Sequence, residues 1–158
     1  MSRVIYSLYI DIPEDDLDFF DKNIIKKDQI PTNINTKNQF KEHHQKIVDN
    51  KKQYAKSIGV DYFLHENDEN FKHYVKYFKT HYPFITMYNI VNFYKLELMN
   101  NYLHDYDEVL YLDFDAIPVT KDNFFDAWDL SKGIAVYNNN NNIRPTHMPL
   151  DMVMGTIR

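Results

Sequence analysis

The segment Val109-Leu-Tyr-Leu-Asp-Phe-Asp115 determines the fold that we expect for this chain. Its first four residues are apolar without alternation, which is the pattern of a strand covered on both faces. We therefore expect a strand over Val109–Phe114, and Pro118 marks where the chain leaves the sheet because proline cannot donate to a strand ladder. Strands buried on both faces occur mainly in α/β proteins, so the segment points to that class.

The sequence on either side of this segment alternates between strand and helix patterns. We expect further strands over Val4–Ile12, Val60–His65 and Gly133–Tyr137, and helices over Gln39–Ile58, Glu69–His81 and Thr86–His104. This order predicts an α/β domain with a largely parallel central sheet flanked by helices. Residues 14–38 are polar, and we expect a loop there with a helical turn near Asp15–Phe20; Asn138–Asn142 is expected to be a turn.

Helical spacing identifies the buried side of the two longest helices. The expected buried residues are Phe40, His44, Ile47, Ala55 and Ile58 in the first of them, and Met87, Ile90, Val91, Tyr94, Leu98 and Tyr102 in the second. Lys51, Lys52 and Lys56 lie near the C-terminal end of the first helix, where positive charge favours the helix dipole. Gly59 then suits the left-handed position that ends the helix.

Composition limits the classes of function that the chain can serve. With 158 residues and 44% hydrophobic content, the chain suits a single folded domain over residues 1–158. The absence of cysteine excludes disulfides and thiolate chemistry. A net charge of -5 without a basic block argues against nucleic acid as a partner. We find no apolar run long enough for a membrane span and expect a cytoplasmic location by default.

Asp113 and Asp115 are the candidate functional residues of the central segment. In an extended strand, residues two apart face the same way with Cα atoms roughly 6–7 Å apart, so both carboxylates would project to one side. A divalent cation removes the repulsion between them, and oxygen ligands suit Mg²⁺ or Mn²⁺. Open α/β sheets bind ligands beyond the carboxyl ends of their strands. The pair predicts a metal site; the alternative is a solvated strand end or the start of a helix.

The longer stretch Tyr102–Val119 reads Tyr-Leu-His-Asp-Tyr-Asp-Glu-Val-Leu-Tyr-Leu-Asp-Phe-Asp-Ala-Ile-Pro-Val and resembles the signature of GT-A glycosyltransferases. It is most similar to the glycogenin-like enzymes and the lipopolysaccharide galactosyl- and glucosyltransferases, and the match covers about Thr86–Leu130. The resemblance implies a Rossmann-like GT-A domain that binds a nucleotide-sugar donor. It further implies a hexosyltransferase-type enzyme that moves sugar from a donor such as a UDP-sugar to a carbohydrate or other hydroxyl acceptor.

The resemblance also implies roles for single residues. Asp115 looks like the acid that chelates Mn²⁺ or Mg²⁺, and Asp113 like the acid shared between the metal and the ribose of the nucleotide. Neither the residues nor the resemblance identifies a catalytic base or nucleophile, so retention or inversion at the anomeric carbon stays open.

Five further residues are candidates for contacts with the donor. Lys95 lies where the family places a basic residue on the donor diphosphate or sugar, and Asn92 precedes it by one helical turn. Tyr9 and Asp11 end the first strand, where such enzymes hold the nucleobase and ribose, and Phe114 lies between the two acids. For Lys95 the alternative is a solvated lysine in the middle of an amphipathic helix.

Other residues have weaker claims to the site. Tyr88 precedes Lys95 by two helical turns on the same side. His147 is a candidate third metal ligand, because the family often takes that ligand from a position far downstream. Phe124, Phe125 and Trp128 fit core packing better than a platform for the sugar.

The chain departs from the family after the acid pair. The acceptor-binding half of GT-A enzymes follows this motif, whereas here the chain continues only from Ala116 to Arg158. The expected domain is therefore incomplete at its C-terminus. Two alternatives to the enzyme remain. One is a non-catalytic nucleotide-sugar-binding module or fragment, and the other is a haloacid-dehalogenase-like phosphatase, which also has a strand ending in Asp-x-Asp. In the phosphatases the motif usually ends the first strand and has Thr or Val four residues on, a position that Ile117 occupies here.

Overall fold

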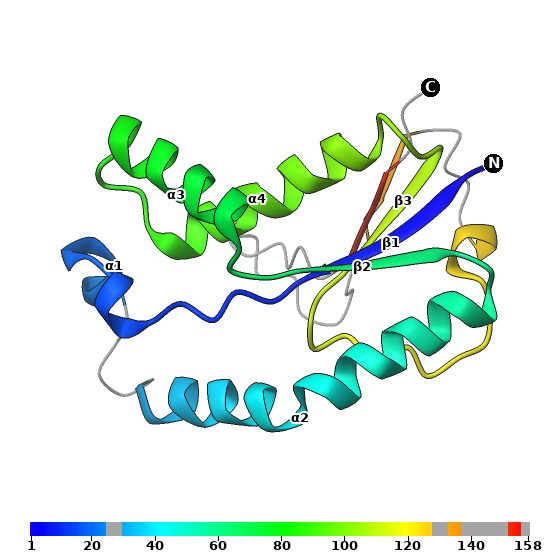
Figure 1. The fold of residues 1–158 in the computed structure, drawn as a ribbon, viewed down its shortest axis with the longest axis horizontal. Helices are drawn as coiled ribbons and strands as arrows, with labels where there is room; N and C mark the ends of the chain where they lie inside the picture. The colour runs from blue at the N-terminus through cyan, green and yellow to red at the C-terminus, as the bar shows by residue number, and fades with distance from the viewer. Residues whose placement is uncertain (25–29, 128–132, 137–151, 156–158) are drawn as a thin grey trace.

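The computed structural model of the chain describes residues 1–24, 30–127, 133–136 and 152–155. Within these residues, five strands form one sheet in the order β2-β1-β3-β5-β4 (Figure 1). The strands are β1 (Arg3–Leu8), β2 (Asp61–His65), β3 (Glu108–Leu112), β4 (Ile134–Val136) and β5 (Met152–Gly155). β1 pairs in parallel with β2 and β3, whereas β5 pairs antiparallel with both β3 and β4. The α/β class is confirmed, with a parallel half and an antiparallel half in one mixed sheet.

The adjacent strands β1 and β3 are buried on both faces. Alternate residues point to opposite sides, as in any strand. Val4, Tyr6, Leu8, Val109 and Tyr111 pack into one hydrophobic cluster, and Ile5, Leu110 and Leu112 into another. All eight side chains are at most 5% exposed. The prediction that the apolar run around residue 110 forms a doubly covered strand is therefore confirmed, although β3 ends at Leu112 rather than at 114.

Helices cover both faces of the sheet. In Figure 1, α2 (Ile30–Ser57) lies on one side of the strands, and α3 (Glu69–His81) and α4 (Met87–Tyr102) lie on the other. Asp68 caps α3 by accepting a hydrogen bond from the Phe71 N–H, and Thr86 caps α4 in the same way. The predicted span of α3 is confirmed residue for residue, and that of α4 to within two residues at its C-terminal end.

The helical turn predicted near Asp15–Phe20 is present, but the loop predicted for the rest of residues 14–38 is wrong where α1 (Phe19–Ile24) and α2 extend into it. A short 3₁₀ helix η1 (Glu14–Asp16) and α1 occupy the first part of this range, and α2 begins at Ile30 instead of residue 39; residues 25–29 lie outside the described part. Lys37 Nζ donates to the Ile12 carbonyl at 2.8 Å and lies 2.8 Å from Asp11 Oδ1. Such long-range contacts stabilise a polar helical segment whose sequence has little apolar periodicity.

The chain connections define a switch point in the parallel half of the sheet. From β1 the chain crosses by α2 to β2 on one side, and it then crosses by α3 and α4 to β3 on the other side. The two crossovers lie on opposite faces (Figure 1). In open α/β sheets a crevice forms outside the carboxyl ends of the strands where the order reverses. Here that place lies between the ends of β1 and β3.

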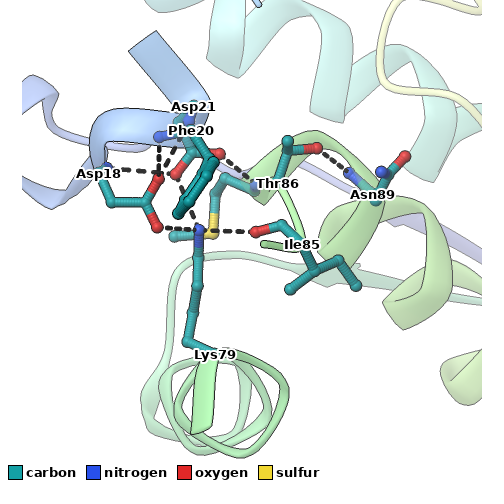
Figure 2. A network of polar contacts seen from close by, with 8 residues as sticks. Asp18, Phe20, Asp21, Lys79, Ile85, Thr86 and Asn89 are labelled. Carbon is teal, nitrogen blue, oxygen red and sulfur yellow. Dashed lines mark hydrogen bonds and ion pairs between the residues drawn. The ribbon is translucent and has the colours of Figure 1, made fainter. Parts of the chain in front are cut away.

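Lys79 of α3 holds α1 against the start of α4 (Figure 2). Its ammonium lies 2.6 Å from Asp18 Oδ2 and 3.0 Å from Asp21 Oδ2, and it donates to the Ile85 carbonyl at 2.8 Å. Asp21 is only 5% exposed, and its second oxygen accepts the N–H of Met87, the first residue of α4, at 2.5 Å. A single lysine therefore compensates two carboxylates and fixes the α3–α4 connection.

Asp18 makes this network sensitive to acid. The hydrogen bond from Lys79, followed by the one from the Asp21 N–H, lowers the pKa of Asp18 from 3.8 to about 2. Because the pKa is lower in the folded state, the ionised carboxylate stabilises the fold above pH 3.8, and this contribution is lost as the pH falls through about 2.

We expect Asp18→Asn to lower the free energy of unfolding at neutral pH by less than about 1 kcal/mol, because the side chain is partly exposed. Asn can still accept the Phe20 and Asp21 N–H groups that Asp18 Oδ1 binds. Urea unfolding measured between about pH 7 and pH 2 should show the difference from the wild type shrinking below about pH 4. A difference that does not change with pH would contradict the assignment.

Candidate functional site

The candidate site lies where β1 and β3 end side by side. Tyr9 follows β1 and Phe114 follows β3, and their ring centres are 4.4 Å apart. The N–H of Tyr9 still donates to the carbonyl of His65 at the end of β2, so this edge of the sheet is ordered by three parallel strands. The fold therefore brings Tyr9, after β1, against Phe114, which lies between the two acids.

The two acids lie in a turn and not on an extended strand. β3 ends at Leu112, and the carbonyl of Asp113 accepts the N–H of Ala116 at 3.0 Å. We call residues 113–116 the acid turn. The prediction that both acids lie on an extended strand is wrong, because beyond the last ladder pair the backbone forms a turn closed by this hydrogen bond. The Asp113 side chain is 25% exposed, and Asp115 is exposed.

Lys95 of α4 meets the carboxylate of Asp113. The ammonium lies 3.1 Å from Asp113 Oδ1, and the Tyr111 hydroxyl donates to the same oxygen. The ammonium also lies 5.1 Å from the centre of the Tyr111 ring, within cation–π range. Burial, and after it the charge of Asp113, raises the pKa of Tyr111, so the phenol remains a neutral donor. Lys95 is thus not a solvated lysine, since it pairs with Asp113 and only 14% of its side chain is exposed.

The position of α4 over the sheet is set by a buried hydrogen bond. The Tyr6 hydroxyl of β1 donates to the carbonyl of Lys95 at 2.6 Å. Asn92 lies one turn before Lys95 and is half-buried, and its side chain makes no hydrogen bond with the residues that the structure describes. Tyr88, a further turn away, is 75% exposed. The structure therefore brings Lys95 to the acid turn and shows no contact of Asn92 or Tyr88 with it.

Lys51 of α2 reaches the acid turn from the opposite face of the sheet. It is 0% exposed, and its ammonium donates to the carbonyls of Asp113 at 2.7 Å and Ala116 at 2.5 Å. Burial lowers the pKa of Lys51 to about 8, although the charges of Asp113 and Asp115 act to raise it. The interpretation of Lys51 as part of a basic helix end missed this role. A signal was present, since position 51 is four residues from both Ile47 and Ala55 on the buried side.

An aromatic cluster of Tyr9, Phe40, His44 and Phe114 lies beside the acid turn. The Phe114 ring is 5.3 Å from His44 and 5.7 Å from Phe40, and Tyr9 is 4.9 Å from His44. Phe114 is 5% exposed, so its side chain packs into the cluster and leaves its backbone for any contact with a donor. The Tyr9 hydroxyl oxygen is buried and has no hydrogen-bond partner among the described residues.

Asp11 pairs with the N-terminal half of α2. Lys37 lies 2.8 Å from Oδ1 and Lys41 2.8 Å from Oδ2. Burial acts to raise the pKa of Asp11, but the hydrogen bonds and charges of the two lysines outweigh it and hold the pKa below its usual value. Both oxygens expected to face a ribose are thus engaged by lysines, and neither lysine was a candidate from the sequence.

The acid turn offers a metal ion two carboxylates. Among the described residues no group of three His, Asp or Glu side chains could hold a metal. Asp115 makes no side-chain contact with the described residues, and both contacts of Asp113 fall on Oδ1. Mg²⁺ is commonly bound by one or two carboxylates together with substrate phosphates and water. Two carboxylates could supply part of the oxygen ligands of a hard divalent cation, and the remainder would have to come from a bound phosphate and water.

The remaining candidates divide between the core and the residues that are not described. Phe125 is 2% exposed and belongs to the α2-side core, with Phe124 packed against it, which confirms the packing prediction for both. Trp128, Asn138–Asn142 and His147 lie outside the described residues. None of the described helices combines the length and apolar composition that a membrane span needs.

Comparison with known proteins adds no relative to this description. No family model matches the chain, and no curated protein or solved structure matches it significantly. The fold and site define an α/β protein that carries an acid turn, Asp113–Ala116, at the carboxyl edge of its parallel strands.

Proposed function

We propose that the chain is the nucleotide-sugar-binding domain of a metal-dependent glycosyltransferase with a GT-A, Rossmann-like fold. The observation that carries the proposal is the position of the acid turn: Lys95 contacts Asp113, two residues before Asp115, at the switch point between β1 and β3. Ligands of open α/β sheets bind at this place. The resemblance of Tyr102–Val119 to the GT-A signature supports the choice of a nucleotide sugar among such ligands.

Asp115 and the free oxygen of Asp113 are the residues that would hold Mn²⁺ or Mg²⁺. The ion, when bound, would neutralise charge on the diphosphate leaving group of the donor. Asp115 suits this role because its carboxylate is exposed and unengaged by the described residues. Asp113 is held in place by the Tyr111 hydroxyl and by Lys95, which leaves Oδ2 for the ion or for the ribose.

The other residues of the site would bind and orient the donor. The Lys95 ammonium lies beside Asp113 on a side chain that is 14% exposed, and it would contact the diphosphate oxygens. Asn92 lies one turn away and has an unengaged amide that could reach the sugar. Tyr9 offers the nucleoside an aromatic ring and a hydroxyl without a partner among the described residues. A UDP-sugar is the proposed donor, and a carbohydrate or other hydroxyl compound is the proposed acceptor.

Titration of UDP-glucose and UDP-galactose into the protein by calorimetry, with and without Mn²⁺, tests this proposal. We expect binding that depends on the metal, with GDP- and ADP-sugars as comparisons. Absence of metal-dependent binding to every nucleotide sugar would reject it. Hydrolysis of the bound UDP-sugar then separates an enzyme from a non-catalytic module, because a module binds without releasing the sugar.

Replacement of Lys95 by methionine tests the diphosphate contact. Lys95→Met keeps most of the aliphatic packing and removes the charge, so we expect Mn²⁺-dependent binding of UDP to weaken about tenfold, the value of one charge-assisted hydrogen bond. Calorimetry measures the affinity, and Lys46→Met, at an exposed position of α2, is the control. Equal affinity of Lys95→Met and the wild type would remove Lys95 from the donor site.

A further inference from the structure

Lys51 is buried in a way that apolar packing does not explain. The residue is 0% exposed, yet its ammonium forms an ion pair with no carboxylate among the described residues. Removing an ammonium from water costs several kcal/mol unless hydrogen bonds and nearby charge compensate it. A leucine or methionine would fill the same space between Ile47 and Ala55 without that cost. The ammonium itself must therefore serve the structure around it.

Both hydrogen-bond acceptors of Lys51 belong to the acid turn. They are the carbonyls of Asp113 and Ala116, the first and last residues of the turn. The Asp113 carbonyl also accepts the Ala116 N–H, so the two ends are joined once through the backbone and once through the ammonium. Lys95 holds the Asp113 carboxylate from the α4 side of the sheet. The turn is thus held from both faces of the sheet. On the α2 side Lys51 binds its backbone carbonyls, and on the α4 side Lys95 binds the Asp113 side chain.

The charge of Lys51 also acts on the two acids. The charges of Asp113 and Asp115 both interact with the ammonium. By the same interaction, a positive charge beneath the turn offsets the repulsion between two carboxylates that are two residues apart in the sequence. Lys51 therefore influences both the backbone conformation of the turn and the electrostatic cost of holding its acids together.

We propose that Lys51 is a positioning residue of the site: it sets the conformation of the acid turn and thereby the spacing of the carboxylates of Asp113 and Asp115. The effect of Lys51 on ligand binding rests on the proposed function. Its effect on the conformation of the turn does not depend on that function. Lys51 is enclosed by the protein and acts on a ligand only through the turn. Outer partners that orient metal ligands typically account for about 10–100-fold in metal affinity.

Lys51→Met tests the inference because it keeps the aliphatic chain and removes the ammonium. Lys52→Met, at the exposed neighbouring position of α2, is the matched control. Binding of Mn²⁺ alone is followed by the electron paramagnetic resonance of the free ion, and binding of UDP in excess Mn²⁺ by calorimetry. We expect Lys51→Met to weaken both about 10–100-fold and Lys52→Met to leave both unchanged. A folded Lys51→Met protein that binds as tightly as the wild type would overturn the inference.

Amide hydrogen exchange separates this inference from the proposed function. In Lys51→Met we expect the Ala116 N–H, which donates within the turn, to exchange faster, while the amides of β3 keep their protection. If the wild type binds neither Mn²⁺ nor UDP, the proposed function fails, and the exchange rate of the Ala116 N–H alone tests the role of Lys51 in the turn. Unchanged protection of Ala116 in Lys51→Met would then overturn that role. If Lys51→Met does not fold, Lys51→Gln is measured instead, because glutamine keeps a hydrogen-bond donor without the charge. If Lys51→Gln shows wild-type exchange at Ala116 and binds Mn²⁺ as tightly as the wild type, the inference is overturned.

Discussion

Asp115→Ala is expected to abolish the Mn²⁺-dependent binding of a UDP-sugar. The carboxylate of Asp115 is exposed and makes no side-chain contact within the described part of the chain, so its removal should leave the fold intact. Loss of a direct metal ligand should cost more than the 10–100-fold that is typical of an outer partner, that is, more than about 100-fold in affinity. Calorimetric titration of the UDP-sugar with and without Mn²⁺ measures the effect.

Asp105→Ala is the matched control for this experiment. Asp105 is also an exposed aspartate near β3, but it precedes the strand and so lies at the opposite edge of the parallel sheet. We expect the affinity of Asp105→Ala for the UDP-sugar and Mn²⁺ to equal that of the wild type. Unchanged binding by Asp115→Ala would remove the acid turn from the metal site. Equal losses in both variants would show a general effect of negative charge and not a site at the turn.

Lys79→Met is expected to have the largest effect on stability. It removes the single ammonium that neutralises Asp21, whose side chain is 4% exposed, and that also pairs with Asp18. Breaking a buried pair by removing one partner leaves an uncompensated buried charge and typically costs about 3–5 kcal/mol. Because Asp18 is 38% exposed and can recover solvation, we expect a loss near the lower end, about 3 kcal/mol, in urea unfolding at neutral pH.

Lys72→Met provides a control on the same helix. Lys72 lies 2.6 Å from Glu69, but 56% and 77% of the two side chains are exposed. Such exposed pairs contribute little, so we expect urea unfolding of Lys72→Met to match that of the wild type. Asp21→Asn in the Lys79→Met background should restore part of the loss, since the amide oxygen can still accept the Met87 N–H. Equal destabilisation by Lys79→Met and Lys72→Met would contradict the role assigned to the network.

Both experiments concern the same architectural feature, the fixing of segments beyond the carboxyl ends of the strands. The segment after β1 is held to α2 through the ion pairs of Asp11, and to α3 through those of Asp18 and Asp21. The segment after β3 is held by Lys51 and Lys95. The candidate site therefore lies between loops that are anchored to helices on both faces of the sheet. Preorganised loops of this kind are what a binding site requires.

Several features of the fold could be predicted from the sequence because local physics alone determines them. Apolar residues without alternation identify β3 as a doubly buried strand, and helical periodicity with a capping residue identifies α3 and α4. The acid pair follows a strand, and Lys95 lies on the helix before it; both facts are visible along the chain. In the structure Lys95 and Asp113 meet at 3.1 Å.

What the sequence by itself determined is thus the α/β class, the parallel crossovers and the residues that gather near the end of β3. Only the tertiary structure decided that the acids lie in a turn, that Lys51 is buried beneath it, and that Lys37 and Lys41 hold Asp11. The physical reason is that Lys37, Lys41 and Lys51 contact groups far from them in the chain, and that Lys51 binds backbone carbonyls. Every residue carries such a carbonyl, so no residue type marks where a distant ammonium will bind.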